Sequence, residues 1–105
     1  MPRFRQTVPV DDYVLDVVLR DLVGHDKKPA AYLVYLHLYG LAARGRWKPV
    51  ASGLRSIAEG TGLSKSAVQA AMATLRGRQL IATHAAHRTA TPSHSVLRHW
   101  RKMRG

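Results

Sequence analysis

Cysteine is absent from this sequence of 105 residues, and only six residues are acidic. Without cysteine the chain has no disulfide framework and no thiolate ligand for a metal ion. Glu59 is the only acidic residue after Asp26, so paired-carboxylate chemistry has no second partner in that part of the chain. The sequence also holds no glycine-rich phosphate loop and no Ser-His-Asp set that a fold would bring together. We therefore predict that the protein is not an enzyme and has no cofactor and no metal site.

Long apolar runs are missing as well. No apolar stretch approaches the roughly 20 residues that a membrane-spanning helix needs. The first ten residues, MPRFRQTVPV, lack the apolar core of a signal peptide. These two absences predict a cytoplasmic protein that makes no membrane contact.

Basic residues greatly outnumber acidic ones, and the formal net charge is +11. Residues 1–43 hold five basic and five acidic residues, whereas residues 44–105 hold twelve basic residues and Glu59. A surface that binds a polyanion needs this kind of asymmetry, because neutralised phosphates supply most of the non-specific affinity for DNA. A basic surface selected only for solubility is the alternative. We expect double-stranded DNA as the partner.

The stretch LRSIAEGTGLSKSAVQAAMATL, residues 54–75, contains two helical patterns that meet at residues 62–64. Gly62 suits the positive φ that ends a helix, and Ser64 suits the cap of the next one. Ser52 is expected to cap the first of the two helices. The second pattern buries one face and leaves a thin face of small residues opposite to it. The buried face consists of Val68, Ala71, Met72 and Leu75.

The order of Ala58, Gly62 and Val68 resembles the helix-turn-helix of bacterial transcription regulators. The continuation RGRQLI, residues 76–81, resembles the entry to the wing in winged-helix regulators of the GntR and MarR type. The resemblance covers residues 52–100 and departs from the pattern at Gly60, where such helices usually carry a longer residue. It implies an α+β fold, mostly helical with a small β-hairpin, in which two helices precede a winged helix-turn-helix. We expect this domain at residues 11–100, between an N-terminal arm (1–10) and a basic tail (101–105).

Two helices are predicted before the motif. The first runs from Asp11 or Asp12 to about Val23, and the second runs from Pro29 to near Arg44. The second is apolar nearly all round, so we predict that it forms a homodimer interface together with the first helix. The alternative is that it is the central core helix. The expected buried stripe of the first helix is Val14, Leu15, Val18 and Leu22.

Two strands, residues 80–84 and 95–100, are predicted to form the wing. Four of the six histidines lie here: His84, His87, His94 and His99. In a hairpin centred near Thr91, His84 and His99 would oppose each other, but their spacing matches no standard zinc motif. Imidazole gains charge as the pH falls toward 6, so DNA affinity is expected to rise with acidification.

The predicted DNA contacts follow from a recognition helix at about 64–77 in the major groove and a wing at about 84–95 on the backbone or minor groove. Gln69 is the candidate for reading a base edge, because its amide can pair with adenine. Small side chains on the same face can touch thymine methyl groups, and basic or hydroxyl side chains can hold phosphates. The predicted contact residues are Ser64, Lys65, Ser66, Gln69, Ala70, Ala73, Arg76, His87 and Arg88.

The predicted function is sequence-preferring duplex DNA binding by a small bacterial transcription regulator. By resemblance, the winged-helix module of a plasmid or phage replication initiator is an alternative that shares the same chemistry. A protein-protein adaptor is the alternative from another class. It would use Tyr32, Tyr35 and Tyr39 as an exposed binding stripe.

Overall fold

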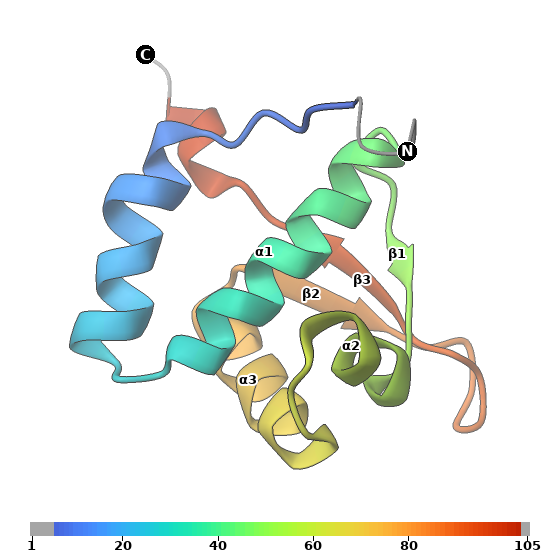
Figure 1. Ribbon diagram of the computed structural model, residues 1–105. Coiled ribbons are helices and arrows are strands. Elements are labelled where there is room, and N and C mark those ends of the chain that lie inside the picture. Colours follow the sequence, from blue (N-terminus) through green and yellow to red (C-terminus); the bar gives the residue numbers. More distant parts are fainter. Residues whose placement is uncertain (1–5, 104–105) are drawn as a thin grey trace.

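A computed structural model describes residues 6–103 of the chain. Arg3 and Arg5 of the expected arm, and Arg104 of the expected tail, lie outside the described residues. The fold is α+β, with helices packed against a small antiparallel sheet (Figure 1). This arrangement agrees with the predicted winged helix-turn-helix preceded by two helices.

The N-terminal helix spans residues 12–25 and is wound mostly as a π-helix, in the segments η2 (Val14–Val18) and η3 (Arg20–His25). Its hydrogen bonds reach five residues back, as from the Asp26 amide to the Asp21 carbonyl at 2.8 Å. Four residues exceed one turn of an α-helix, so its buried face mixes spacings of three and four, whereas four residues of this wider winding do not exceed one turn. The buried side is therefore a single row: Val14, Val18 and Leu22. Leu15 was predicted to be buried with them, and this was wrong: it is turned outward.

Helix α1 (Pro29–Arg44) has the predicted bounds, with Pro29 in its first turn and Gly45 directly after it. It packs against the N-terminal helix, α2, α3 and the sheet, so it is the central core helix (Figure 1). The predicted exposure of its tyrosines as a binding stripe is wrong, because all three are buried. Their hydroxyls meet main-chain groups: Tyr32 donates to the Val14 carbonyl at 3.2 Å, and Tyr35 donates to the Leu97 carbonyl at 3.0 Å.

Helices α2 (Leu54–Thr61) and α3 (Lys65–Gly77) form the helix-turn-helix. Gly62 ends α2 with φ at 80°, in the left-handed region that glycine tolerates. The Ser64 hydroxyl caps α3 by accepting a hydrogen bond from the Ala67 amide at 3.1 Å. Both predictions are confirmed. Ser52, however, does not cap α2: Gly53 holds that position, and Ser52 is buried beside the sheet.

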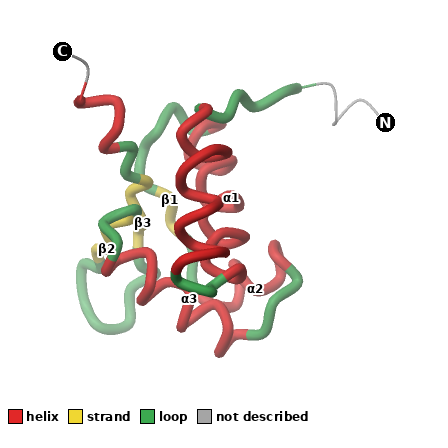
Figure 2. The backbone as a smooth tube through the Cα atoms, turned by 90° about the vertical axis from the view of Figure 1, so that its left-hand side faces the viewer, coloured by secondary structure: helices red, strands yellow, loops and turns green. Residues whose placement is uncertain are grey.

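The sheet has three antiparallel strands in the order β1-β3-β2. They are β1 (Val50–Ala51), β2 (Ile81–His84) and β3 (Ser93–Val96). The sheet lies against α1, as two perpendicular views show (Figures 1 and 2). In the part of the chain that the structure describes, no helix has the length and apolar character needed to cross a membrane.

The second wing strand was predicted at residues 95–100, and its bounds are wrong. β3 ends at Val96, and a 3-10 turn, η4 (His99–Met103), follows. The chain leaves the sheet because Trp100 stacks on Tyr13, with ring centres 4.6 Å apart, and donates to the Asp11 carboxylate at 2.7 Å. His84 consequently pairs with Ser93, and the predicted opposition of His84 and His99 does not occur.

Candidate nucleic-acid interface

Helix α3 separates a buried face from an exposed one as its sequence predicts. Val68, Ala71, Met72 and Leu75 are buried, and the helix packs on α1 and α2. The opposite face and the N-terminal end are open to solvent. All seven predicted contact residues from this helix and its cap are exposed: Ser64, Lys65, Ser66, Gln69, Ala70, Ala73 and Arg76.

The N-terminal end of α3 is suited to an anion. The Ser64 hydroxyl satisfies the Ala67 amide and lies 3.3 Å from the Ser66 hydroxyl. The amides of a first helical turn and the positive end of the helix dipole attract negative charge, and Lys65 adds a cation at the same end. These groups together make a phosphate contact chemically reasonable.

A recess with a volume of about 230 Å³ lies between α3 and the hairpin. Gln69 and Arg76 line it from α3, whereas Thr83 and Pro92 line it from the hairpin. Helix α3 and the base of the hairpin therefore open into one shared space. The remaining lining residues are Leu54, Met72 and His94.

A chain of hydrogen bonds runs behind this recess from the sheet to α3. The Nε2 atom of His94 lies 2.8 Å from the Ser52 carbonyl oxygen, and its Nδ1 atom lies 3.0 Å from the Thr83 hydroxyl. Because a carbonyl oxygen only accepts, Nε2 carries the proton and Nδ1 accepts from Thr83. Thr83 in turn accepts a long hydrogen bond of 3.4 Å from Arg76. This chain joins the edges of the recess to the middle of the sheet.

His94 was counted among the four wing histidines expected to gain charge as the pH falls, yet it is buried. Burial lowers its pKa, while the bond to the Ser52 carbonyl raises it and Arg76 lowers it. The net direction of the pKa shift is downward, so His94 takes up a proton at a lower pH than an unperturbed imidazole does. The period-two pattern SHSV could have identified it, because His94 and Val96 point to one side of β3 and Ser93 and Ser95 point to the other.

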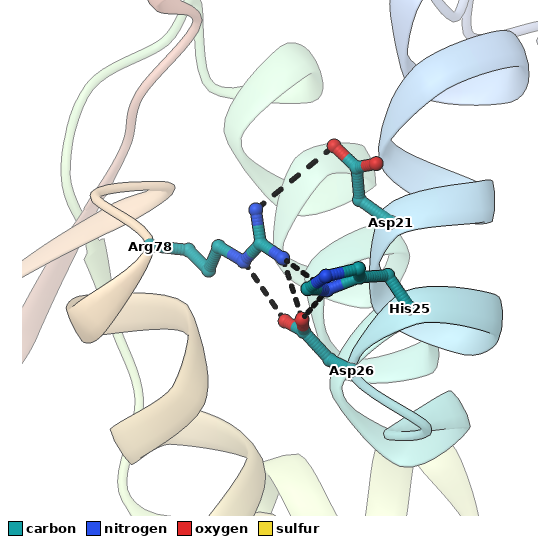
Figure 3. A network of polar contacts seen from close by, with 4 residues as sticks. All are labelled: Asp21, His25, Asp26 and Arg78. Carbon is teal, nitrogen blue, oxygen red and sulfur yellow. Dashed lines mark hydrogen bonds and ion pairs between the residues drawn. The ribbon is translucent and has the colours of Figure 1, made fainter.

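Several arginines of the basic half are engaged within the protein. Arg78 binds Asp26, with Nε and Oδ2 2.8 Å apart, and also lies near Asp21 and His25 (Figure 3). Arg101 binds both oxygens of Asp11. The guanidinium of Arg98 lies 3.4 Å from the ring centre of Trp47, which is a cation–π contact. Fewer cations are therefore available to an external anion than the formal count suggests. On α3 and the wing loop the exposed ones outside these contacts are Lys65, Arg76 and Arg88.

The wing loop, residues 85–92, carries His87 and Arg88 in exposed positions. His87 and Thr89 lie 3.1 Å apart between ring nitrogen and hydroxyl. The loop projects from the sheet at the end of the molecule that also carries α2 (Figure 1). Over residues 6–103, no three histidine or carboxylate side chains are grouped closely enough to hold a metal ion.

The exposed face of α3, the recess and the wing loop thus form one surface, built from residues 64–76 and 83–92. Comparison with known proteins adds no relative: no family model, no curated protein and no solved structure matches the chain.

Proposed function

We propose that this protein binds duplex DNA through α3 and the wing loop. The observation that carries the proposal is the recess shared by Gln69 and Arg76 of α3 with Thr83 and Pro92 of the hairpin. All of its lining residues except Leu54 come from residues 60–105, a part of the chain that has eight basic residues and no acidic one. A polyanion with a regular groove complements such a surface in both charge and shape.

The roles of the side chains follow from their positions. Ala70 and Ala73 keep the outer face of α3 thin, so that the helix can enter a major groove and contact thymine methyl groups. Gln69, between them and the recess, is placed to pair with an adenine edge. Lys65 at the start of α3 and Arg88 in the wing loop hold phosphates and set the register. Because few side chains can read bases, most of the affinity is electrostatic.

A DNA-binding surface of this kind fits a small transcription regulator. This role requires the protein to meet DNA in the cytoplasm of a bacterial cell. The same surface would serve any other process that needs sequence-preferring contact with duplex DNA.

The test is a duplex-DNA titration at two or more salt concentrations, after selection of a preferred sequence from random duplexes. Binding should weaken steeply with salt, and Lys65→Ala should weaken binding to all sequences while lowering the salt slope by about 1. Lys28→Ala, which removes an exposed lysine at the start of α1, is the matched control and should change neither quantity. Gln69→Ala should cost about 1–3 kcal/mol on the selected sequence only. Absence of saturable, salt-dependent binding would reject the proposal.

A further inference from the structure

The N-terminal helix carries an exposed apolar row next to its buried row. Four large hydrophobic side chains are exposed among the described residues: Leu15 (49%), Leu19 (39%), Val23 (38%) and Leu33 (48%). The first three are spaced by four along the π-wound helix, so they lie on one line. Leu33 belongs to the second turn of α1, which begins shortly after that helix ends. Single exposed leucines are ordinary, but a row along one helix marks an interaction surface.

A charged row runs beside the apolar row. Asp12, Asp16 and Arg20 are also spaced by four, and all three are exposed. Lys27, likewise exposed, follows the end of the helix. The exposed charges on this side are therefore acidic near the start of the helix and basic near its end. This polarity is self-complementary when two copies of the helix run in opposite directions.

We propose that a second copy of this chain binds here, with the two N-terminal helices antiparallel and the two-fold axis at Leu19. In that arrangement Leu15 faces the partner's Val23, and Leu19 faces the partner's Leu19. In the same register Asp16 lies near the partner's Arg20, and Asp12 lies near the partner's Lys27, each within about one helical turn of the facing position. The two-fold axis repeats the Leu15–Val23 pair and both charge pairs, so each of these contacts is formed twice, whereas the Leu19 pair lies on the axis and is formed once. A parallel pairing does not bring the acidic end of one helix to the basic end of the other.

The pairing surface is small compared with the roughly 800 Å² per partner of a typical stable complex. A concentration-dependent dimer in the micromolar range is the expected behaviour. The face differs from the one predicted from sequence, where α1 was the main contact, because α1 is covered by the rest of its own chain. The proposal does not depend on DNA binding, since the DNA surface lies on α3 and the wing.

Sedimentation of the full chain over a concentration series, without DNA, tests the pairing. Leu19→Asp should abolish the dimer. Asp16→Arg and Arg20→Asp should each weaken it by about tenfold or more, because each sets two like-charge pairs across the interface. The double variant Asp16→Arg/Arg20→Asp should restore it, because the pairs re-form with exchanged signs. Lys48→Asp, a charge reversal in the exposed turn after α1, should have no effect.

Thermal unfolding of each variant separates lost pairing from lost folding, and the restoring double variant does so independently. A parent that stays monomeric at every concentration overturns the proposal. So does a double variant that dimerises no better than the two single ones, because the charged rows then do not face each other. A stable complex that forms only with another protein overturns it as well.

Discussion

Arg78 forms an ion pair with Asp26 (Figure 3). Arg78 is the first residue after α3, and Asp26 caps the C-terminal end of the N-terminal helix. The guanidinium donates to both carboxylate oxygens, which fixes geometry as well as charge. Asp21 lies 4.0 Å from the same guanidinium. The contact therefore joins the helix proposed to pair with a second copy to the end of the helix proposed to read DNA. It is a direct link between the elements that carry the two surfaces.

Removing the carboxylate of Asp26 should weaken this junction in a pH-dependent way. The hydrogen bonds from Arg78 and from His25 hold the pKa of Asp26 well below its usual range. A lowered pKa means that the contact stabilises the fold above the unfolded-state value of about 3.9 and that this stability is lost as the pH falls further. Urea unfolding of the parent should show this loss below about pH 4, whereas Asp26→Asn should be less stable at pH 7 and flatter in acid.

Arg78→Ala removes the other partner of the same ion pair, and Arg55→Ala is its control. Arg55 and Glu59 form an exposed pair one turn apart, 3.5 Å between charged atoms, with no link to another element. Such pairs contribute about 0.3–0.5 kcal/mol. Equal effects of Arg55→Ala and Arg78→Ala on the free energy of unfolding would show that the Arg78 junction is only another surface pair.

Helix packing explains why Gly60 stands where the helix-turn-helix pattern usually has a longer residue. A Cβ atom at this position would overlap the ring of His37 on α1 and come within 2.8 Å of its Nε2 atom. The longer residue usual at this place would therefore displace His37. The sequence alone does not predict this close approach, because α1 and α2 come together only in the folded chain.

The close approach of position 60 to His37 predicts that substitutions at these two positions have coupled effects on the free energy of unfolding. Gly60→Ala should gain helix propensity of up to about 1 kcal/mol when His37 is first replaced by alanine, because the space is then free. In the parent the same change should stabilise nothing, because the ring must move. Chemical unfolding of the four proteins in this cycle gives the coupling free energy, expected at about 1 kcal/mol. A value near zero would mean that the ring turns aside without cost.

Local signals account for the elements that sequence predicted well. Pro29 and Gly45 bracket α1, and Gly62 and Ser64 form the turn of the helix-turn-helix, because each acts through its own backbone conformation or nearest amides. The exposed face of α3 follows from helical periodicity alone. These features need no knowledge of the rest of the chain.

What sequence missed depends on partners distant in the chain. The second wing strand ends early because Trp100 donates to the Asp11 carboxylate. Ser52 is held at the sheet, where its amide donates to the Pro92 carbonyl and its carbonyl accepts from His94, so the N-cap of α2 falls on Gly53. Leu15 was assigned to the core because an α-helical period was assumed, whereas the helix is π-wound. The arginine count overstated the charge available to DNA, because Arg78 is held by a carboxylate more than fifty residues away.

Buried His94 should make the fold sensitive to mild acid. Its pKa is lowered, first by burial, so the unfolded chain takes up a proton at a higher pH than the folded protein does. Stability is full above the unfolded-state value of about 6.5 and falls with pH until the folded pKa is reached. His37, whose pKa burial also lowers, adds to the same trend. Unfolding free energies measured between pH 8 and about 5 should decrease.

His94→Gln tests which histidine is responsible. An amide can still meet the Ser52 carbonyl but has no proton to gain, so the variant should be less stable at pH 8 and less sensitive to acid. His37→Gln serves as the comparison. If only the His37 variant flattens the pH profile, the neutral bridge from Ser52 to Thr83 is not what makes the fold acid-sensitive.

A carboxylate on the exposed face of α3 should oppose DNA binding without harming the fold. Ala73 is exposed and contributes nothing to the core, so Ala73→Glu should leave the thermal unfolding midpoint nearly unchanged. It would place a negative charge where the proposed groove contact is made, and like-charge contacts at an interface cost several kcal/mol. Affinity for duplex DNA should therefore fall at least about tenfold. Thr7→Glu adds the same charge on the exposed N-terminal segment, beside the end of α1 and far from α3. If both variants lose affinity equally, net charge alone governs binding and α3 is not the contact surface.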